Sequence, residues 1–313
     1  MLDYPLQLTP EYRDYVWGGS RLRPGIVPTA EAWVVYEHNR IAAGPPQGLT
    51  LGEAARQQGA NLLGRRAVQQ TAERFPLLIK LLDCAQWLSL QVHPDDEQAL
   101  ALEGPGFFGK TEAWHVLEAD PGAQLIAGLK AGTPPDVLAA SIRQGTILDW
   151  VQYLSVQAGD TLLVRPGVVH ALGPGLLVYE VQQTSDVTYR VYDWGRPQTP
   201  QRRLHIEKAL AVVRPDVATA VCPLPPLVDG EPRLLCQSAY FSLEILSARE
   251  RCVELNTQGE SFHALTVIAG EAELRLKGGF CRLKRFASAI VPAAAGPYEI
   301  APQAGFRALK ASV

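Results

Sequence analysis

The chain has 313 residues, enough to bury a large core and to favour about two domains. Its 29 basic and 32 acidic side chains leave a net charge of −3, which argues against a nucleic-acid groove or a polybasic membrane patch. Five cysteines without a CxxC pair argue against a disulfide framework and indicate a reducing compartment. Because neither a secretory signal nor a long apolar run is visible, we predict a soluble, cytoplasmic protein.

The first part of the chain combines strands with one helical region. The segment AEAWVVYEH, which starts at residue 30, has the composition of a strand. Residues 50–73 change to helical spacing of their apolar side chains, and Thr50 with Glu53 forms a capping box at the start. The runs FPLLIKLLD and WLSLQVHPDD then predict two strands joined by a short turn.

The middle of the chain predicts a hairpin, a helix and a return to strands. GKTEAWHVLEADPGAQLIAGL has strand composition around a turn at residues 120–122. Residues 133–150 predict a helical interlude, with Thr133 as N-cap and Pro134 as the first helical residue. Strands resume with SVQAGDTLLVRPGVVHALGPGLLVYEV and continue to YRVYDW.

A proline-rich run, VCPLPPLVDGEPR at 221–233, is the best linker candidate. The many short strands on both sides of it favour a jelly-roll sandwich or barrel. GDTLLVRPGVVHAL before it parallels RFASAIVPAAAGPYEI after it, which indicates two related units. We therefore predict a mainly β fold of two jelly-roll β-barrel units with a few inserted helices. Residues 1–220 form the catalytic, metal-binding unit, and 221–313 form a unit without metal ligands.

Four side chains make a candidate metal site. Gln91 and His93 stand two residues apart on a predicted strand, so they project from the same face. A carboxylate follows in GKTEAW (Glu112) and a second imidazole in PGVVHAL (His170). A strand histidine alone is more often structural, but this mixed nitrogen and oxygen set suits a divalent ion such as Zn²⁺, with room for water or substrate.

The chain resembles type I mannose-6-phosphate isomerases (phosphomannose isomerases) of the short bacterial form, which consist of two cupin domains. The resemblance covers nearly the whole length and rests on WGG at 17–19, PLLIKLLD, LSLQVHPDD, GKTEAWHVL and, above all, the block at 159–196. It implies an aldose–ketose isomerase of carbohydrate metabolism. The implied reaction interconverts mannose 6-phosphate and fructose 6-phosphate through a zinc-stabilised cis-enediol.

The resemblance also implies residue roles. The family's zinc ligands fall on Gln91, His93, Glu112 and His170, with Gln91 variably counted. The family's catalytic residues correspond to Arg190, Glu180 and Lys110. Glu180 is the first candidate for the base that takes the proton from carbon, and Lys110 is the second. Substrate binding falls on Lys80 and Ser89, near the phosphate, and on Trp17 at the pocket wall.

Other interpretations remain open at this point. Glu180 could pair with Arg190 for folding alone, and Lys80 could extend to solvent. The chain could also be a non-catalytic, metal-containing sugar-phosphate-binding cupin, or a metal-dependent oxygenase, although oxygenases usually have more histidine ligands. Because binding needs no base, Arg190, Glu180 and Lys110 together favour the isomerase. We expect a small-molecule sugar phosphate as partner, no nucleic acid or membrane, and a monomer or homodimer.

Overall fold

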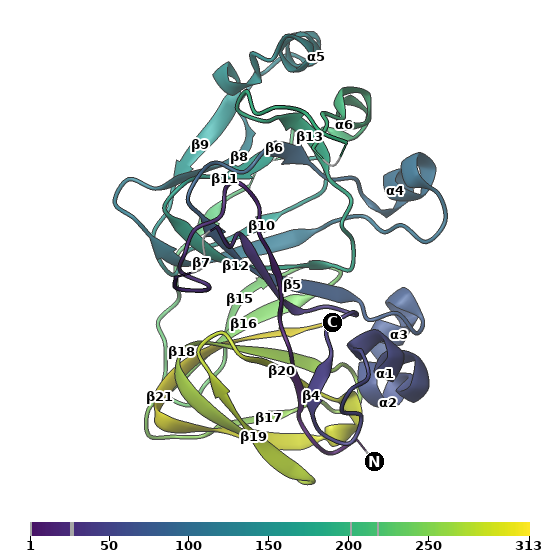
Figure 1. Ribbon diagram of the computed structural model, residues 1–313, viewed down its shortest axis with the longest axis vertical. Coiled ribbons are helices and arrows are strands. Elements are labelled where there is room, and N and C mark those ends of the chain that lie inside the picture. The colour runs from purple at the N-terminus through teal and green to yellow at the C-terminus, as the bar shows by residue number, and fades with distance from the viewer. Residues whose placement is uncertain (1, 26–27, 201, 218) are drawn as a thin grey trace. The chain divides into compact units, whose positions relative to one another are not determined.

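The computed structural model describes residues 2–25, 28–200, 202–217 and 219–313 (Figure 1). Its strands pair antiparallel and outnumber its helices, which confirms the predicted mainly β fold. The chain forms two compact units. The terminal unit contains Met1–Tyr12, Ala32–Lys80 and Leu224–Val313, and the central unit contains Arg13–Glu31 and Leu81–Pro223. The domain boundary predicted after residue 220 lies close to Pro223, after which the chain passes between the units for the last time. The predicted division into two domains itself stays a prediction.

The terminal unit is built on one sheet of order β15-β16-β21-β18-β20-β1-β4, to which β17 adds at β21 and β19 at β18. Its strands are β1 (Leu6–Leu8), β4 (Ile41–Ala43), β15 (Arg233–Gln237), β16 (Ser242–Ala248), β17 (Val253–Asn256), β18 (His263–Leu276), β19 (Gly279–Lys284), β20 (Ser288–Val291) and β21 (Pro297–Ser312). The pairing of β18 with β21 shifts register on either side of Ala269, and such bulges bend a sheet. The buried face carries a core that includes Leu265 and Ala308.

Three short helices in the terminal unit occupy the region predicted at 50–73. They are α1 (Leu51–Gln58), α2 (Ala60–Leu63) and α3 (Arg65–Thr71). The capping box of Thr50 and Glu53 is present at the start of α1, as predicted. Gly59 and Gly64 separate the helices and have φ angles of 48° and 86°, a left-handed conformation that interrupts a right-handed helix. The helical spacing of apolar residues therefore predicted where the helical region lies, but not that it is divided into three helices.

The central unit is a sandwich. One layer has the order β14-β10-β7-β12, and the other β13-β6-β11-β8-β9. The strands are β6 (Leu90–Val92), β7 (Glu112–Ala119), β8 (Gln124–Leu129), β9 (Val151–Ser155), β10 (Thr161–Val164), β11 (His170–Leu172), β12 (Leu176–Gln183), β13 (Tyr189–Tyr192) and β14 (Val221–Cys222). The first layer continues into β5 (Leu77–Cys84), β3 (Glu31–Val35) and β2 (Glu11–Arg13), whose residues are shared between the units.

Side chains of both layers form one apolar core in the central unit, with Trp114 and Val178 from the first layer and Leu125 and Leu172 from the second. Within the described residues, each sheet path has two end strands. The unit is therefore an open sandwich and not the closed barrel that was predicted. Side-chain packing joins its two layers, whereas a barrel is closed by a continuous ladder of backbone hydrogen bonds.

The helices of the central unit are α4 (Asp96–Glu103), α5 (Pro135–Gln144), the 3-10 turn η1 (Ile147–Asp149) and α6 (Ile206–Val212). The helices α5 and α6 lie beside the layer that contains β6, β8 and β13 (Figure 1), and Leu138 and Ala209 belong to the same apolar cluster as Ile126. None of the helices in the described part of the chain has the length and apolar character needed to span a bilayer.

The start of α5 differs from the prediction. Pro134, not Thr133, occupies the N-cap position, and the helix begins one residue later than expected. The Thr133 hydroxyl donates to the Lys130 carbonyl at 2.6 Å, so it closes the preceding turn and does not cap the helix. The turn predicted at residues 120–122 is present, with Gly122 at a φ of 81°.

Candidate metal centre

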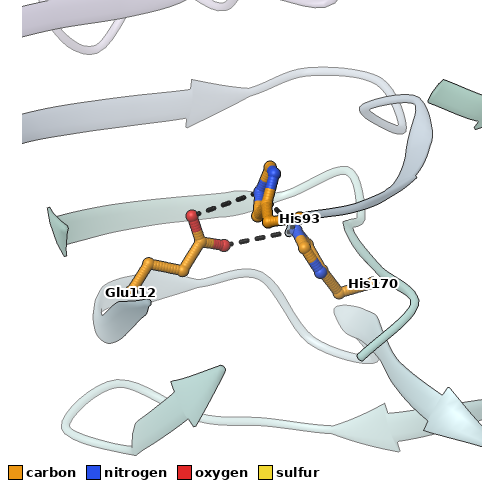
Figure 2. Close-up of side chains that lie close together, drawn as sticks. All are labelled: His93, Glu112 and His170. Atoms are coloured by element: carbon orange, nitrogen blue, oxygen red, sulfur yellow. Dashed lines mark hydrogen bonds and ion pairs between the residues drawn. The ribbon is translucent and has the colours of Figure 1, made fainter. Parts of the chain in front are cut away.

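His93, Glu112 and His170 converge in the interior of the central unit (Figure 2). One candidate ligand atom from each lies within 4.8 Å of the others, and all three side chains are buried. His170 Nε2 lies 3.1 Å from His93 Nε2 and 3.2 Å from Glu112 Oε1. His93 Nε2 lies 3.5 Å from Glu112 Oε2. Two imidazole nitrogens and a carboxylate thus face one small volume.

The two layers of the sandwich supply these side chains from opposite sides. Glu112 is the first residue of β7, and it pairs with Val164 of β10 and Gln182 of β12. His170 opens β11 in the other layer, directly opposite Gln91 of β6. His93 follows the end of β6. The cluster therefore lies where strand ends from both layers meet, next to a core that fixes the distance between the layers.

Backbone carbonyls orient both imidazoles. His93 Nδ1 donates to the Val187 carbonyl at 2.9 Å, and His170 Nδ1 donates to the Val168 carbonyl at 2.8 Å. A ring that donates through Nδ1 presents the lone pair of Nε2 when it is neutral. Both Nε2 lone pairs consequently point at each other and at Glu112. This arrangement of ligand and supporting carbonyl is common for metal-bound histidine.

The protonation states follow from burial and charge. Burial, with the Lys110 charge, lowers the pKa of His93 to about 3, and burial also lowers the pKa of His170. Burial alone would raise the pKa of Glu112, but the charge of Lys110 and the interactions with His93 and His170 outweigh it and hold that pKa well below its usual range. At neutral pH the cluster therefore holds two neutral imidazoles and one carboxylate.

These residues fit a divalent cation. Glu112 Oε1 is buried and accepts no hydrogen bond within the described part of the chain, because the nearby His170 nitrogen offers a lone pair and no proton. Converging lone pairs repel each other unless a positive charge lies between them. Gln91 Nε2 lies 3.3 Å from His170 Nε2, and a half-turn of its amide would bring the oxygen to that position.

Lys110 reaches the same cluster. Its Nζ lies 3.0 Å from His93 Nε2 and forms an ion pair with Glu112 Oε2. The side chain is buried, and its Nζ is held beside the carboxylate by this ion pair. The structure thus brings together five of the residues singled out in the sequence, namely Gln91, His93, Lys110, Glu112 and His170.

Glu180 lies on β12 and connects to the cluster through a tryptophan. It pairs with Trp114 across the strands, and the Trp114 indole N–H donates to Glu180 Oε2 at 2.9 Å. The Trp114 ring in turn meets the His170 ring edge-on, with 5.3 Å between centroids. The Glu180 carboxylate is buried and held by this bond. The sequence alone did not indicate a role for Trp114, because that role depends on which residue of β12 lies opposite it.

Arg190 lies on β13, opposite Gln91 of β6. Its guanidinium donates from Nη1 to the Arg203 carbonyl at 3.1 Å, and its backbone N–H donates to His205 Nδ1 at 3.2 Å. Burial lowers the pKa of Arg190, but an arginine remains charged at neutral pH. Its buried Nε makes no hydrogen bond within the described residues. One donor of this charged group is therefore left for another partner.

The three predicted substrate-binding residues are buried in different places. Ser89 directly precedes β6, in the same strand run as Gln91 and His93. Trp17 belongs to the core of the central unit. Lys80 belongs to the terminal unit, where its Nζ lies 5.1 Å from the centre of the Trp33 ring. Such a cation–π contact accounts for part of its burial without extension to solvent.

Comparisons with known proteins agree with this geometry. Residues 6–105 match the family model for the catalytic domain of type I phosphomannose isomerase. The chain is 37% identical over 255 residues to a mannose-6-phosphate isomerase from Streptococcus mutans, which covers 76% of this chain and 77% of that protein. It is 36% identical to a mannose-6-phosphate isomerase from Bacillus subtilis, over 68% of this chain and 69% of the relative.

Solved structures show the same architecture. The crystal structure of a mannose 6-phosphate isomerase from Bacillus subtilis aligns with a TM-score of 0.84 at 30% identity and covers 99% of both chains. A mutant phosphomannose isomerase from Salmonella typhimurium aligns with a TM-score of 0.78 at 17% identity, over 98% of this chain and 99% of that chain. The second match shows the shared fold alone.

Proposed function

Because this chain belongs to the type I phosphomannose isomerase family, we propose that it interconverts mannose 6-phosphate and fructose 6-phosphate. The observation that carries the proposal is the buried cluster of His93, Glu112 and His170, whose ligand atoms converge while the Nδ1 atoms of both imidazoles face backbone carbonyls. A carbon atom next to a carbonyl is a weak acid, so the reaction needs a charged, water-poor site that stabilises an enediolate. The cluster and Lys110 provide such a site.

We propose Zn²⁺ as the resident ion, one per chain. His93, Glu112 and His170 would hold it, and the Gln91 amide oxygen would complete the set. When bound, the ion supplies a Lewis acid for the oxygen atoms on C1 and C2 of the sugar. The neutral imidazoles and the charged carboxylate are already in the protonation states that metal ligands require.

The chain's own residues would move the proton and hold the charge. We propose that Glu180 takes the proton from C2 of the aldose and returns it to C1, while the hydroxyl proton of O2 is transferred to O1, so that a cis-enediol lies between the two sugars. The Trp114 N–H holds this carboxylate in place. Arg190, whose buried Nε has no hydrogen-bond partner among the described residues, would supply fixed positive charge near the enediolate. Lys110 is the alternative candidate for the base, because its Nζ lies at the proposed metal site, 3.0 Å from His93 Nε2, and its neutral amine could accept a proton.

The remaining assignments rest on resemblance. We propose that Lys80 and Ser89 bind the phosphate and that Trp17 lines the pocket. Location in the cytoplasm and the state as monomer or homodimer also stay predictions, as does the expectation that no nucleic acid or membrane is bound.

A coupled assay with fructose 6-phosphate tests the function. We expect turnover by zinc-loaded protein, loss of turnover after chelation, and recovery when Zn²⁺ is restored. In D₂O, product formed through an enediol should carry deuterium at the carbon that receives the proton. Metal-loaded protein that binds the sugar phosphate without converting it would contradict the proposal and favour a non-catalytic binding protein.

A further inference from the structure

The segment before Glu112 has no regular secondary structure. Residues 104–111 lie between α4 and β7, and the ladder of β7 begins only at Glu112. Lys110 nevertheless reaches both His93 and Glu112. A metal site requires its ligands to be held within about 0.5 Å of their working positions. Something other than a strand ladder must therefore fix this segment.

Gln183, the last residue of β12, holds the segment from one side. Its side-chain Oε1 accepts the Thr111 N–H at 2.8 Å, and its own backbone N–H donates to the Thr111 carbonyl at 3.1 Å. Both polar groups of the Thr111 backbone are thus satisfied by one residue. The Gln183 side chain is buried, so a shift of either partner would leave an unsatisfied polar group away from water.

Asp96, the first residue of α4, holds the segment from the other side. Its Oδ1 accepts the Gly109 N–H at 2.7 Å and the Gln183 side-chain N–H at 3.1 Å. The Lys110 N–H donates to the Pro94 carbonyl at 3.0 Å. These bonds join the turn that directly follows one ligand, His93, to the residues that directly precede another.

Close packing adds to the hydrogen bonds. A Cβ atom built on Gly109 would lie 2.5 Å from the Asp95 carbonyl carbon, so the two backbones approach more closely than any other residue would allow. Asp95 caps α4 in a reciprocal arrangement with Gln98, which fixes the start of the helix. Asp96 therefore stands on a rigid support.

We propose that Asp96 and Gln183 act as a positioning clamp for the candidate metal centre. The clamp sets the separation between the segment that carries His93 and the segment that carries Lys110 and Glu112. The inference rests on the proposed metal site and adds two residues that do not touch the ion. The pairing of Glu112 with Val164 and Gln182 does not depend on the clamp, so its loss should loosen the site while the sandwich stays folded.

Substitutions at Asp96 separate hydrogen bonding from charge. Asp96→Asn keeps an Oδ1 that can accept both N–H groups, so it should bind Zn²⁺ nearly as well as the wild type. Asp96→Ala removes the acceptor and should weaken Zn²⁺ binding by about 10-fold to 100-fold, the usual effect of losing a group that supports a metal ligand. The pair serves as its own matched control at the same site.

A charge swap tests the contact itself. Gln183→Glu still accepts the Thr111 N–H but places a carboxylate against Asp96, so it should weaken Zn²⁺ binding to a similar extent. The double variant, Asp96→Asn with Gln183→Glu, removes the like charge and offers a new donor from the Asn side chain. It should recover a clear part of the lost affinity, a coupling that two independent structural defects would not show.

The readout is the Zn²⁺ dissociation constant, measured by competition with a chromophoric chelator on the full-length chain. Thermal unfolding of the metal-free proteins shows whether the fold is kept, and we expect midpoints close to the wild type. The clamp is wrong if Asp96→Ala binds Zn²⁺ as tightly as Asp96→Asn. It is equally wrong if the double variant is no better than Gln183→Glu. If Gln183→Glu does not fold, the comparison of Asp96→Ala with Asp96→Asn tests the clamp by itself.

Activity separates this inference from the proposed function. With fructose 6-phosphate, a loosened centre should lower kcat of the zinc-saturated enzyme more than it raises KM. Wild-type protein that binds Zn²⁺ but has no isomerase activity would overturn the proposed function, while the order of Zn²⁺ affinities among the variants would still test the clamp.

Discussion

At the scale of single residues, the candidate centre depends on which nitrogen of each histidine carries the proton. The Val187 and Val168 carbonyls fix the proton on Nδ1 of His93 and His170, so that both Nε2 atoms can offer a lone pair to a cation. Losing one imidazole would leave two protein donors from the cluster and the Gln91 amide, a set too weak to retain zinc.

We therefore expect His170→Ala to lose its metal and its isomerase activity together. Elemental analysis after gel filtration should show about one zinc per wild-type chain and close to none in the variant. His38→Ala is the matched control, because its imidazole is exposed and belongs to the terminal unit. Retention of one zinc per chain in the His170 variant would refute the ligand assignment.

Arg190 and the proposed phosphate residues should differ in their kinetic effects. A charge that acts only in the transition state lowers kcat and kcat/KM together, and losing one such donor typically costs about 10²–10³ in kcat. Arg190→Ala should show this pattern with KM nearly steady. Lys80→Ala and Ser89→Ala should mainly raise KM, because a phosphate contact is shared by ground and transition states. Steady-state kinetics with exchanged patterns would place the phosphate at Arg190.

The sequence predicted the side chains of the centre better than their supports. Gln91 and His93 could be paired by strand alternation, and Glu112 and His170 by donor chemistry. The carbonyls of Val187 and Val168 could not be found, because every residue has a carbonyl and only the fold decides which one meets an imidazole. The bond from Trp114 to Glu180 depends on the register of β7 and β12, which composition does not specify.

At the scale of elements, local signals located the helices but not all of their ends. The capping box at Thr50 was visible because both partners are side chains at a fixed spacing. Gly59 and Gly64 could each have been tolerated inside a helix, and the structure shows that they end one. Thr133 has the right chemistry for a cap, but its hydroxyl bonds to the preceding turn instead.

The cap at Thr50 gives a stability prediction without a functional component. Its hydroxyl accepts the Glu53 N–H at 3.2 Å, and Thr50→Ala removes this acceptor from the first turn of α1. We expect a loss of about 1 kcal/mol in unfolding free energy, measured by chemical denaturation. Thr50→Ser keeps the acceptor and should stay near the wild type. Equal stability of the two variants would show that the cap contributes nothing here.

At the scale of the whole molecule, the two units repeat one strand pairing with different side chains. Glu112 of β7 pairs with Val164 in the central unit, and His263 of β18 pairs with Val291 in the terminal unit. Each valine ends its strand and is followed by a turn that contains proline. In the terminal unit, however, His263 Nδ1 is satisfied by the Tyr298 hydroxyl at 2.6 Å. The similarity between the sequences of the two halves thus reflects the same strand register in both units.

His263 should make the fold sensitive to acid. Burial, with the nearby Lys310 charge, lowers the pKa of His263 from 6.5 to about 3. Below pH 6.5 the unfolded chain binds a proton that the folded chain does not, so stability present above pH 6.5 is lost as the pH falls towards 3. Between pH 7 and pH 5 this histidine should cost about 2 kcal/mol of unfolding free energy.

Comparison with His263→Gln isolates this contribution. The glutamine can still bond to Tyr298 but does not titrate, so the stability difference between the two proteins should shift by that amount in favour of the variant on going from pH 7 to pH 5. The acid sensitivity of other groups cancels in the comparison, and above pH 7 the difference should be constant. Parallel pH profiles from 7 to 5, obtained by denaturant titration, would contradict the prediction.

The discontinuous segments of the terminal unit bear on how the protein is made. Leu6 of β1 pairs with Ile290 of β20, so a strand from the start of the chain must wait for one near its end. At ribosomal speeds this delay is on the order of tens of seconds. All segments of the central unit have been synthesised by Pro223. On a translating ribosome, the ligand-bearing sandwich can therefore close first, while the earliest strands of the nascent chain still lack their partners.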